Sequence, residues 1–76
     1  MTMKEHDMVV LAEDLPEHGL RAGDVGTVVL VHEDGRGYEV EFVTLDGETV
    51  AVVTLKSSQV RPICRHEIAH ARPVAG

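Results

Sequence analysis

The sequence is poor in the residues that cross-link a chain or fill a large aromatic core: it has one cysteine, no tryptophan, one tyrosine and one phenylalanine. Because Cys64 has no partner cysteine, the chain can form neither an intramolecular disulfide nor a paired-cysteine zinc site, and we expect a cytoplasmic location. The first seven residues are too polar for a secretory signal, and apolar runs such as Val28 to Val31 are far below the ~20 residues of a membrane helix. We therefore expect no membrane attachment.

At 76 residues the chain is expected to form one domain, residues 1–76, with a barrel over about 6–62 and a tail over 63–76. A chain of this size is stabilised by only about 4–11 kcal/mol. Because small scaffolds often gain stability from a partner, association with another protein or with a second copy is an early expectation.

Basic residues are also scarce, and they are unevenly placed. The formal net charge is −6, whereas a protein that neutralises nucleic-acid phosphates needs clustered lysine and arginine. Residues 1–55 hold twelve acidic and three basic residues, a net charge of −9, while residues 56–76 hold four basic residues and one acidic residue, a net charge of +3. Two interpretations follow: the tail lies against its own acidic barrel or in solvent, or it docks on an acidic partner.

Short apolar or alternating segments predict five β-strands. The clearest is the third, in which Tyr38, Val40 and Phe42 alternate with Glu39 and Glu41, so that one face meets a core and the other meets water. The predicted strands cover about 7–12, 26–32, 38–44, 49–55 and 59–61, with one 3₁₀ turn at 56–58 and an end to regular pairing at Pro62 unless it sits on a sheet edge. We predict no helix of normal length before residue 65.

Five strands with tight turns and one long first loop predict an all-β fold: a small five-stranded antiparallel barrel followed by a short C-terminal tail. Closing the sheet buries one apolar face and leaves little edge exposed. The long loop covers residues 13–24, and Leu15 and Leu20 are expected to anchor it under one end of the barrel.

Glycines mark two of the predicted turns. Gly23 and Gly26 are expected to supply backbone freedom at a barrel corner, and Gly47 completes the Asp-Gly turn of a hairpin. The first pair does not form a phosphate-binding loop, because it lacks the further glycine of the dinucleotide motif, the lysine of the P-loop and a following helix.

The tail contains His66, Glu67 and His70 in the pattern H-E-x-x-H, in which two histidines one helical turn apart bind zinc and the glutamate acts as general base. Proline at 62 and 73 limits any helix here to a short one, and in an extended segment residues four apart lie about 13 Å from each other. We therefore expect no cofactor and no catalytic residue, with these three side chains as weak metal candidates. Cys64 is expected to pack as a small hydrophobe rather than to act as a nucleophile.

Two surfaces are candidates for binding another protein. The strand at 49–55 is apolar on both faces, so Val50 and Val52 are expected to point outward, unless the tail segment Ile63 to Ile68 folds back over them. The second candidate is the acidic first loop, with the residues Glu13, Asp14, Glu17 and Asp24.

Four segments together carry a family resemblance: Asp7 to Leu11, Glu13 to Val29, Tyr38 to Leu55 and Val60 to Pro62. They resemble the small bacterial proteins grouped as domain-of-unknown-function family 4926, over about residues 6–72. The resemblance implies a stand-alone SH3-like barrel without an established activity, and the genes around such proteins suggest a toxin–antitoxin or accessory role. A shorter likeness, within the second segment, is to the SH3-like part of nitrile hydratase β subunits and to KOW domains, whose basic surface is absent here.

These observations favour a non-enzymatic protein-interaction module, an acidic barrel that binds another protein such as a basic, toxin-like partner. The alternatives are a KOW-like nucleic-acid-associated barrel, which the negative charge disfavours, and a small metal-binding protein that uses His66 and His70. A homo-oligomer joined through Val50 and Val52 is compatible with the first hypothesis.

Overall fold

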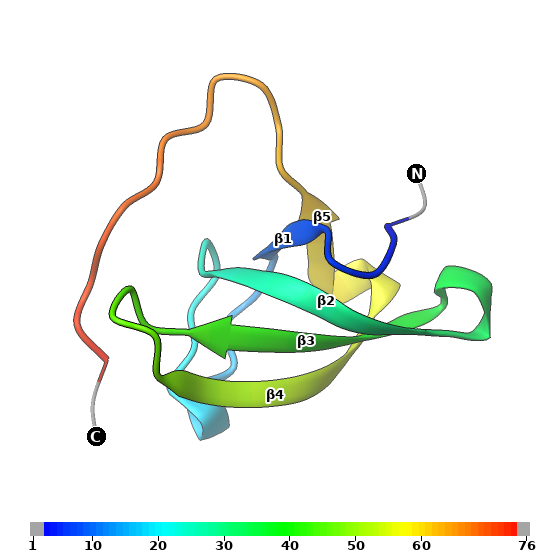
Figure 1. The fold of residues 1–76 in the computed structure, drawn as a ribbon, viewed down its shortest axis with the longest axis horizontal. Coiled ribbons are helices and arrows are strands. Elements are labelled where there is room, and N and C mark those ends of the chain that lie inside the picture. Colours follow the sequence, from blue (N-terminus) through cyan, green and yellow to red (C-terminus); the bar gives the residue numbers. More distant parts are fainter. Residues whose placement is uncertain (1–2, 75–76) are drawn as a thin grey trace.

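The computed structural model describes residues 3–74, and within them it contains five β-strands, three single 3₁₀ turns and no α-helix (Figure 1). The strands are β1 (Met8–Leu11), β2 (Val25–His32), β3 (Gly37–Val43), β4 (Thr49–Lys56) and β5 (Val60–Pro62). The 3₁₀ turns are η1 (Pro16–His18), η2 (Glu33–Gly35) and η3 (Ser57–Gln59). All paired strands are antiparallel, and the predicted all-β class with five strands is confirmed.

The five strands form one sheet in the order β4-β3-β2-β1-β5, and they share one core cluster of buried side chains. The alternation predicted for β3 is confirmed, because Tyr38, Val40 and Phe42 are buried while Glu39 and Glu41 face outward and are partly exposed. Every other strand also contributes to the same core cluster, which Met3 joins from outside the strands. Pattern reasoning missed Met3 because a single apolar residue in a polar N-terminal segment has no periodicity to reveal it.

The two edge strands, β4 and β5, are not hydrogen-bonded to each other within residues 3–74, so the sheet does not close into a fully hydrogen-bonded barrel. The turn η3 connects them directly, and Leu55 and Val60 on either side of it belong to the same core cluster. Pro62 pairs with Val9 on β1, and β5 has no partner on its other side. An edge position is where a residue without an N–H group can be accommodated in a sheet.

Two irregularities in register decide which apolar side chains face solvent. In β2 the register shifts between Val28 and Leu30, and Val29 and Leu30 are both exposed. In the β3–β4 ladder Phe42 pairs with Ala51, and the next residue of β3, Val43, pairs with Thr49. Val50 is skipped in this pairing and is therefore the extra residue of a bulge. Val50 consequently packs against the core cluster and is partly buried. The prediction that Val50 points outward is therefore wrong, whereas Val52 does lie on the exposed face.

The turn glycines serve different purposes. Gly23 and Gly47 have φ angles of 97° and 95°, values that side-chain-bearing residues rarely adopt. Gly26 lies inside β2 and is buried, and a Cβ atom placed on it would come 2.5 Å from Cγ1 of Val40. Gly26 is therefore required for space between packed strands, and the expectation that it supplies backbone freedom at a corner gives the wrong physical reason.

Candidate interaction surfaces

The loop between β1 and β2 is closed at its base by two leucines. The N–H of Leu15 donates to the carbonyl of Leu20 at 2.9 Å, and the N–H of Leu20 donates back at 3.1 Å. Both side chains are buried in the core cluster, so the prediction that they anchor the loop is confirmed. Between them lies η1, which ends at Gly19 in the left-handed conformation with φ 69°.

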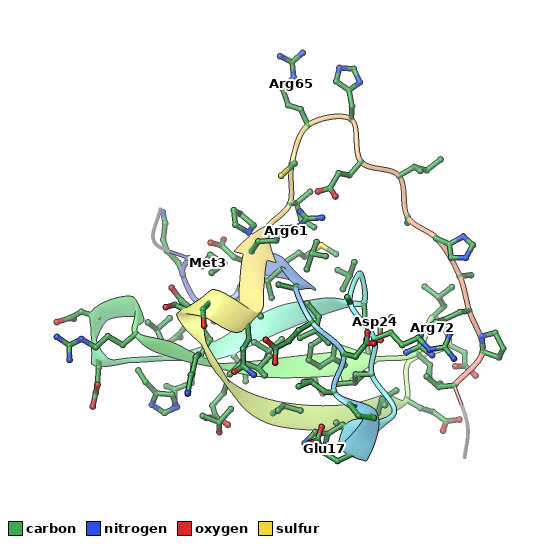
Figure 2. All side chains as sticks on the ribbon, turned by 180° about the vertical axis from the view of Figure 1, so that it is seen from behind. Met3, Glu17, Asp24, Arg61, Arg65 and Arg72 are labelled. Carbon is green, nitrogen blue, oxygen red and sulfur yellow. The ribbon has the colours of Figure 1, made fainter. Side chains whose placement is uncertain are left out.

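Three of the four acidic residues predicted for this surface have different environments along the loop. The Asp14 carboxylate accepts a hydrogen bond from the N–H of Ala22 at 2.9 Å, and the Glu13 carboxylate accepts one from Nε2 of Gln59 at 3.1 Å. Glu17 lies on η1, is exposed, and points away from Asp24 (Figure 2). Asp14 and Glu13 therefore help to hold the loop together as well as carrying charge.

The fourth acidic residue, Asp24, holds the C-terminal tail through an arginine. Its carboxylate accepts from the backbone N–H of Arg21 at 2.8 Å and from two nitrogens of the Arg72 guanidinium, Nε at 2.9 Å and Nη2 at 2.5 Å. The same Nη2 donates to the carbonyl of Gly19 at 3.1 Å. Figure 2 shows the two side chains meeting beside the loop, although they are 48 residues apart in the sequence.

The electrostatics of this pair follow from its partial burial. The side chains of Asp24 and Arg72 are only 19% and 22% exposed. Burial acts to raise the pKa of Asp24, but the hydrogen bonds from Arg72 and from the Arg21 N–H, with the charges of both arginines, outweigh it and lower the pKa. The same contact raises the pKa of Arg72. Of the two interpretations of the basic tail, the structure shows the first: Arg72 binds the chain's own acidic loop, and residues 63–71 are exposed to solvent.

The H-E-x-x-H segment does not form the helical turn that a zinc site of this type needs. Residues 67–74 have no regular secondary structure, and His66 and His70 are exposed. The Glu67 carboxylate instead binds the Arg61 guanidinium at 2.6 and 3.0 Å and the N–H of Cys64 at 2.6 Å, and the hydrogen bond from Arg61 is the main cause that lowers its pKa to about 2. No group of three metal-binding side chains occurs in residues 3–74. The geometry therefore does not bring His66, Glu67 and His70 together as a metal site.

Cys64 is exposed, so the prediction that it packs as a small hydrophobe is wrong. The physical reason is that it lies two residues beyond the end of β5, in a segment whose residues 63–71 are all exposed.

The outer face of the sheet combines exposed apolar side chains with two carboxylates. Glu41 on β3 pairs in register with Thr27 on one side and Val52 on the other, and Thr27 pairs with Met8 on β1. Exposed apolar residues on this face and along its bulge are Met8, Val25, Val29, Leu30, Val43 and Val52, which we call the outer apolar face. Val52 is 53% exposed and Val43 is 51% exposed, so a substantial part of each side chain meets solvent.

The tail does not cover this face. Ile63 is 48% exposed and Ile68 is 93% exposed, which shows that neither side chain is buried against the sheet. The alternative in which Ile63 to Ile68 folds back over the patch around Val52 is therefore wrong. Each of the six residues of the outer apolar face is at least 39% exposed.

Hydrogen bonds hold the two carboxylates of this face in place. Glu39 accepts from Oγ1 of Thr54 at 2.6 Å and lies 2.7 Å from Nε2 of His32, and the hydrogen bond from Thr54, followed by that from His32, lowers its pKa. Glu41 accepts from Oγ1 of Thr49 at 2.8 Å. The face thus presents fixed negative charge beside apolar side chains.

Sequence reasoning found the acidic loop and Val52 but missed two parts of these surfaces. The contact of Arg72 with Asp24 joins residues that no local pattern relates, and the opposite charges of tail and body were the only signal of it. The exposure of Leu30 depends on the irregular register in β2, which an uninterrupted apolar run does not reveal.

None of the helical turns within residues 3–74 is long and apolar enough to cross a membrane.

Comparison with known proteins identifies a family for the five-stranded sheet but no relative of known activity. No curated protein and no solved structure matches the chain. One family matches residues 5–62, a range that contains all five strands and ends at the last residue of β5, so that the tail lies outside it. The chain therefore belongs to the family described as Domain of unknown function (DUF4926).

Proposed function

We propose that this protein is a non-enzymatic protein-interaction module, and that its outer apolar face binds a basic partner protein. The observation that carries the proposal is the group of exposed apolar side chains around Val52 and Val43, next to the carboxylates of Glu39 and Glu41. Contiguous exposed apolar surface bordered by polar groups is typical of protein contact sites.

Apolar burial and charge supply different parts of the binding. Removing a valine side chain from water contributes about 1.5 kcal/mol, so the outer apolar face supplies part of the free energy of a contact that also needs the residues around it. The net charge of −9 over residues 1–55 attracts a basic surface from a distance, which speeds association and makes it salt-sensitive. A toxin with a basic active surface is a partner of this kind, and covering that surface is how an antitoxin-like protein would act.

We also place this function in the cytoplasm. Cys64 is exposed and has no partner cysteine in the chain, an arrangement suited to a reducing compartment.

The test is co-expression with the product of the neighbouring gene, followed by size-exclusion chromatography at low and high salt. We expect a complex at low salt that weakens at high salt. Val52→Asp should weaken it by about tenfold or more, because it replaces apolar contact area with a carboxylate that must lose its bound water in the contact. Ser58→Asp, on the exposed turn η3, adds the same charge away from the face and should leave binding unchanged.

Two results would contradict the proposal. The first is that the two proteins never elute together at low salt; the second is that Val52→Asp and Ser58→Asp have the same effect. Light scattering on the protein alone separates a homo-oligomer from a complex with another protein, since only the former gives a mass above that of the monomer without the partner.

A further inference from the structure

The loop residues that hold Arg72 are fixed by contacts that do not involve the tail. The N–H of Asp24 donates to the carbonyl of Arg21 at 3.0 Å, and the carbonyl of Asp24 accepts from the N–H of Leu11 on β1 at 2.8 Å. Its carboxylate is oriented by the N–H of Arg21. Gly19, the other acceptor, ends a turn whose base is the paired Leu15 and Leu20. The carboxylate of Asp24 and the carbonyl of Gly19, which we call the arginine receptor, are therefore held in position by the barrel itself.

The tail, by contrast, has few contacts. It leaves β5 and arcs away from the sheet before it returns beside the loop (Figure 1). Among the described residues, its hydrogen bonds to other parts of the chain are those of Glu67 and the Cys64 thiol with the end of β5, and those of Arg72. Residues 63–71 are all exposed. Arg72 thus occupies the receptor at the end of a loosely held tether, as a ligand would.

The chemistry of the receptor favours arginine. Nε and Nη2 of one guanidinium reach both carboxylate oxygens of Asp24, while Nη2 also reaches the Gly19 carbonyl. A planar fork of donors makes such a two-point contact, whereas the single ammonium group of lysine does not. The recess beside this contact, about 590 Å³, is lined by Pro16 and Leu20 of the loop and by Pro73 and Val74 of the tail, so the residues that follow the arginine lie along the loop.

We propose that the arginine receptor is a docking site for an extended, arginine-bearing segment of a partner protein, and that the chain's own Arg72 occupies this site in competition with it. The inference rests on the proposed function only in taking the chain to be a protein-binding module. It concerns a different surface from the outer apolar face and adds a means of regulation, since a partner must displace the tail.

The competition has a calculable size. A segment tethered by about ten residues has an effective concentration in the millimolar range. An intramolecular ligand at that concentration weakens the binding of a similar external segment by about two- to tenfold when its own dissociation constant is 0.1–1 mM. Removing the tethered arginine should restore the full affinity.

The experiment uses full-length protein and a synthetic peptide spanning residues 68–74, titrated at low salt while backbone amide signals are followed by NMR. In the Arg72→Gln protein we expect the peptide to shift the amide signals of the loop, with a dissociation constant about two- to tenfold lower than in wild type. Arg65→Gln is the matched protein control: Arg65 lies at the outermost part of the tail and points away from the loop (Figure 2), so this variant should bind as wild type does.

Further variants test the chemistry of the site. Adding Asp24→Asn to the Arg72→Gln protein should abolish the shifts, because Asn keeps an oxygen to accept the Arg21 N–H but loses the charge. Adding Glu17→Gln instead removes a loop charge that points away from Arg72 and should leave binding intact (Figure 2). A peptide carrying Arg72→Gln should not bind. Thermal melts of each variant confirm that it is folded.

Several outcomes would overturn the inference. They are the absence of loop shifts in the Arg72→Gln protein, equal peptide affinity for that variant and wild type, and equal effects of Asp24→Asn and Glu17→Gln. A dimer of the wild-type protein that disappears in Arg72→Gln would show that the site takes the tail of a second copy instead. Because the titration contains no partner protein, its failure is distinct from loss of binding by Val52→Asp, which tests the proposed function.

Discussion

Gly26 offers a sharp test of how the strands around the loop are packed. It lies in β2 two residues after Asp24, and it pairs with Val9 of β1. A methyl group added there would lie 2.5 Å from Cγ1 of Val40, 2.9 Å from Cε1 of Phe42 and 3.1 Å from the carbonyl oxygen of Glu41. The two side-chain distances are shorter than a Cβ atom tolerates and the distance to the oxygen is tight, so Gly26→Ala must displace Val40 and Phe42 and press on the backbone of β3.

The magnitude follows from two opposing effects. Overpacking of a well-filled core costs about 1–3 kcal/mol, and a backbone oxygen among the close contacts places this case at the upper end. Replacing glycine restricts the unfolded chain, which returns about 0.4–1 kcal/mol. We expect Gly26→Ala to lower the free energy of unfolding by about 2 kcal/mol, and hence the Tm by about 8–16 °C for a domain of this size.

Urea denaturation followed by circular dichroism measures this change, with Gly23→Ala as the matched control. A Cβ on Gly23 meets nothing within 4 Å, but its φ of 97° is strained for alanine. We therefore expect Gly23→Ala to cost about 1 kcal/mol, through backbone strain alone. Val40→Ala removes the nearest clashing atom, so the double variant Gly26→Ala/Val40→Ala should be at least about 1 kcal/mol more stable than the sum of the single effects predicts.

Either of two results would refute this reasoning: a Gly26→Ala protein within about 0.5 kcal/mol of wild type, or strictly additive effects of Gly26→Ala and Val40→Ala. The first would mean that β2 and β3 have room at this position. The second would mean that the cost arises in the backbone of β2 and not from contact with Val40.

Three further predictions concern the tail and the alternative functions. The pKa of Glu67 is lowered to about 2 from its usual 4.5, so its contact with Arg61 is complete above about pH 4.5 and is lost as the pH falls through about 2. A pH titration of the Glu67 carboxyl carbon by NMR should show a midpoint near 2. A midpoint near 4.5 would contradict the contact. Because Cys64 is exposed, a thiol reagent should modify it fully in the native protein, and protection until urea is added would argue against its position. Protein prepared without a histidine tag should contain no stoichiometric zinc, and a 1:1 zinc content would support the metal-binding hypothesis instead. The protein should not bind single-stranded or duplex RNA at low salt, and saturable RNA binding would support the KOW-like hypothesis instead.

The predicted strands agree with the observed ones to within one or two residues because their signals are local. Alternation in β3 and the Asp-Gly turn before β4 act over a few residues, and the all-β class follows from the series of short strands. The candidate surfaces were predicted less completely. Val52 was placed correctly on the exposed face, whereas Val50 turned inward because a bulge shifts the period of two that the prediction assumed.

The sequence by itself determined the class of fold, the turns and the separation of an acidic body from a basic tail, since these depend on neighbouring residues and on total charge. Only the tertiary structure decided what the tail does. The contact of Arg72 with Asp24 and Gly19 requires the β1–β2 loop and the end of the chain to meet in space. The tertiary structure also decided that Gly26 is needed for the space between β2 and β3 rather than for its backbone freedom, because the atoms that a side chain would meet belong to β3.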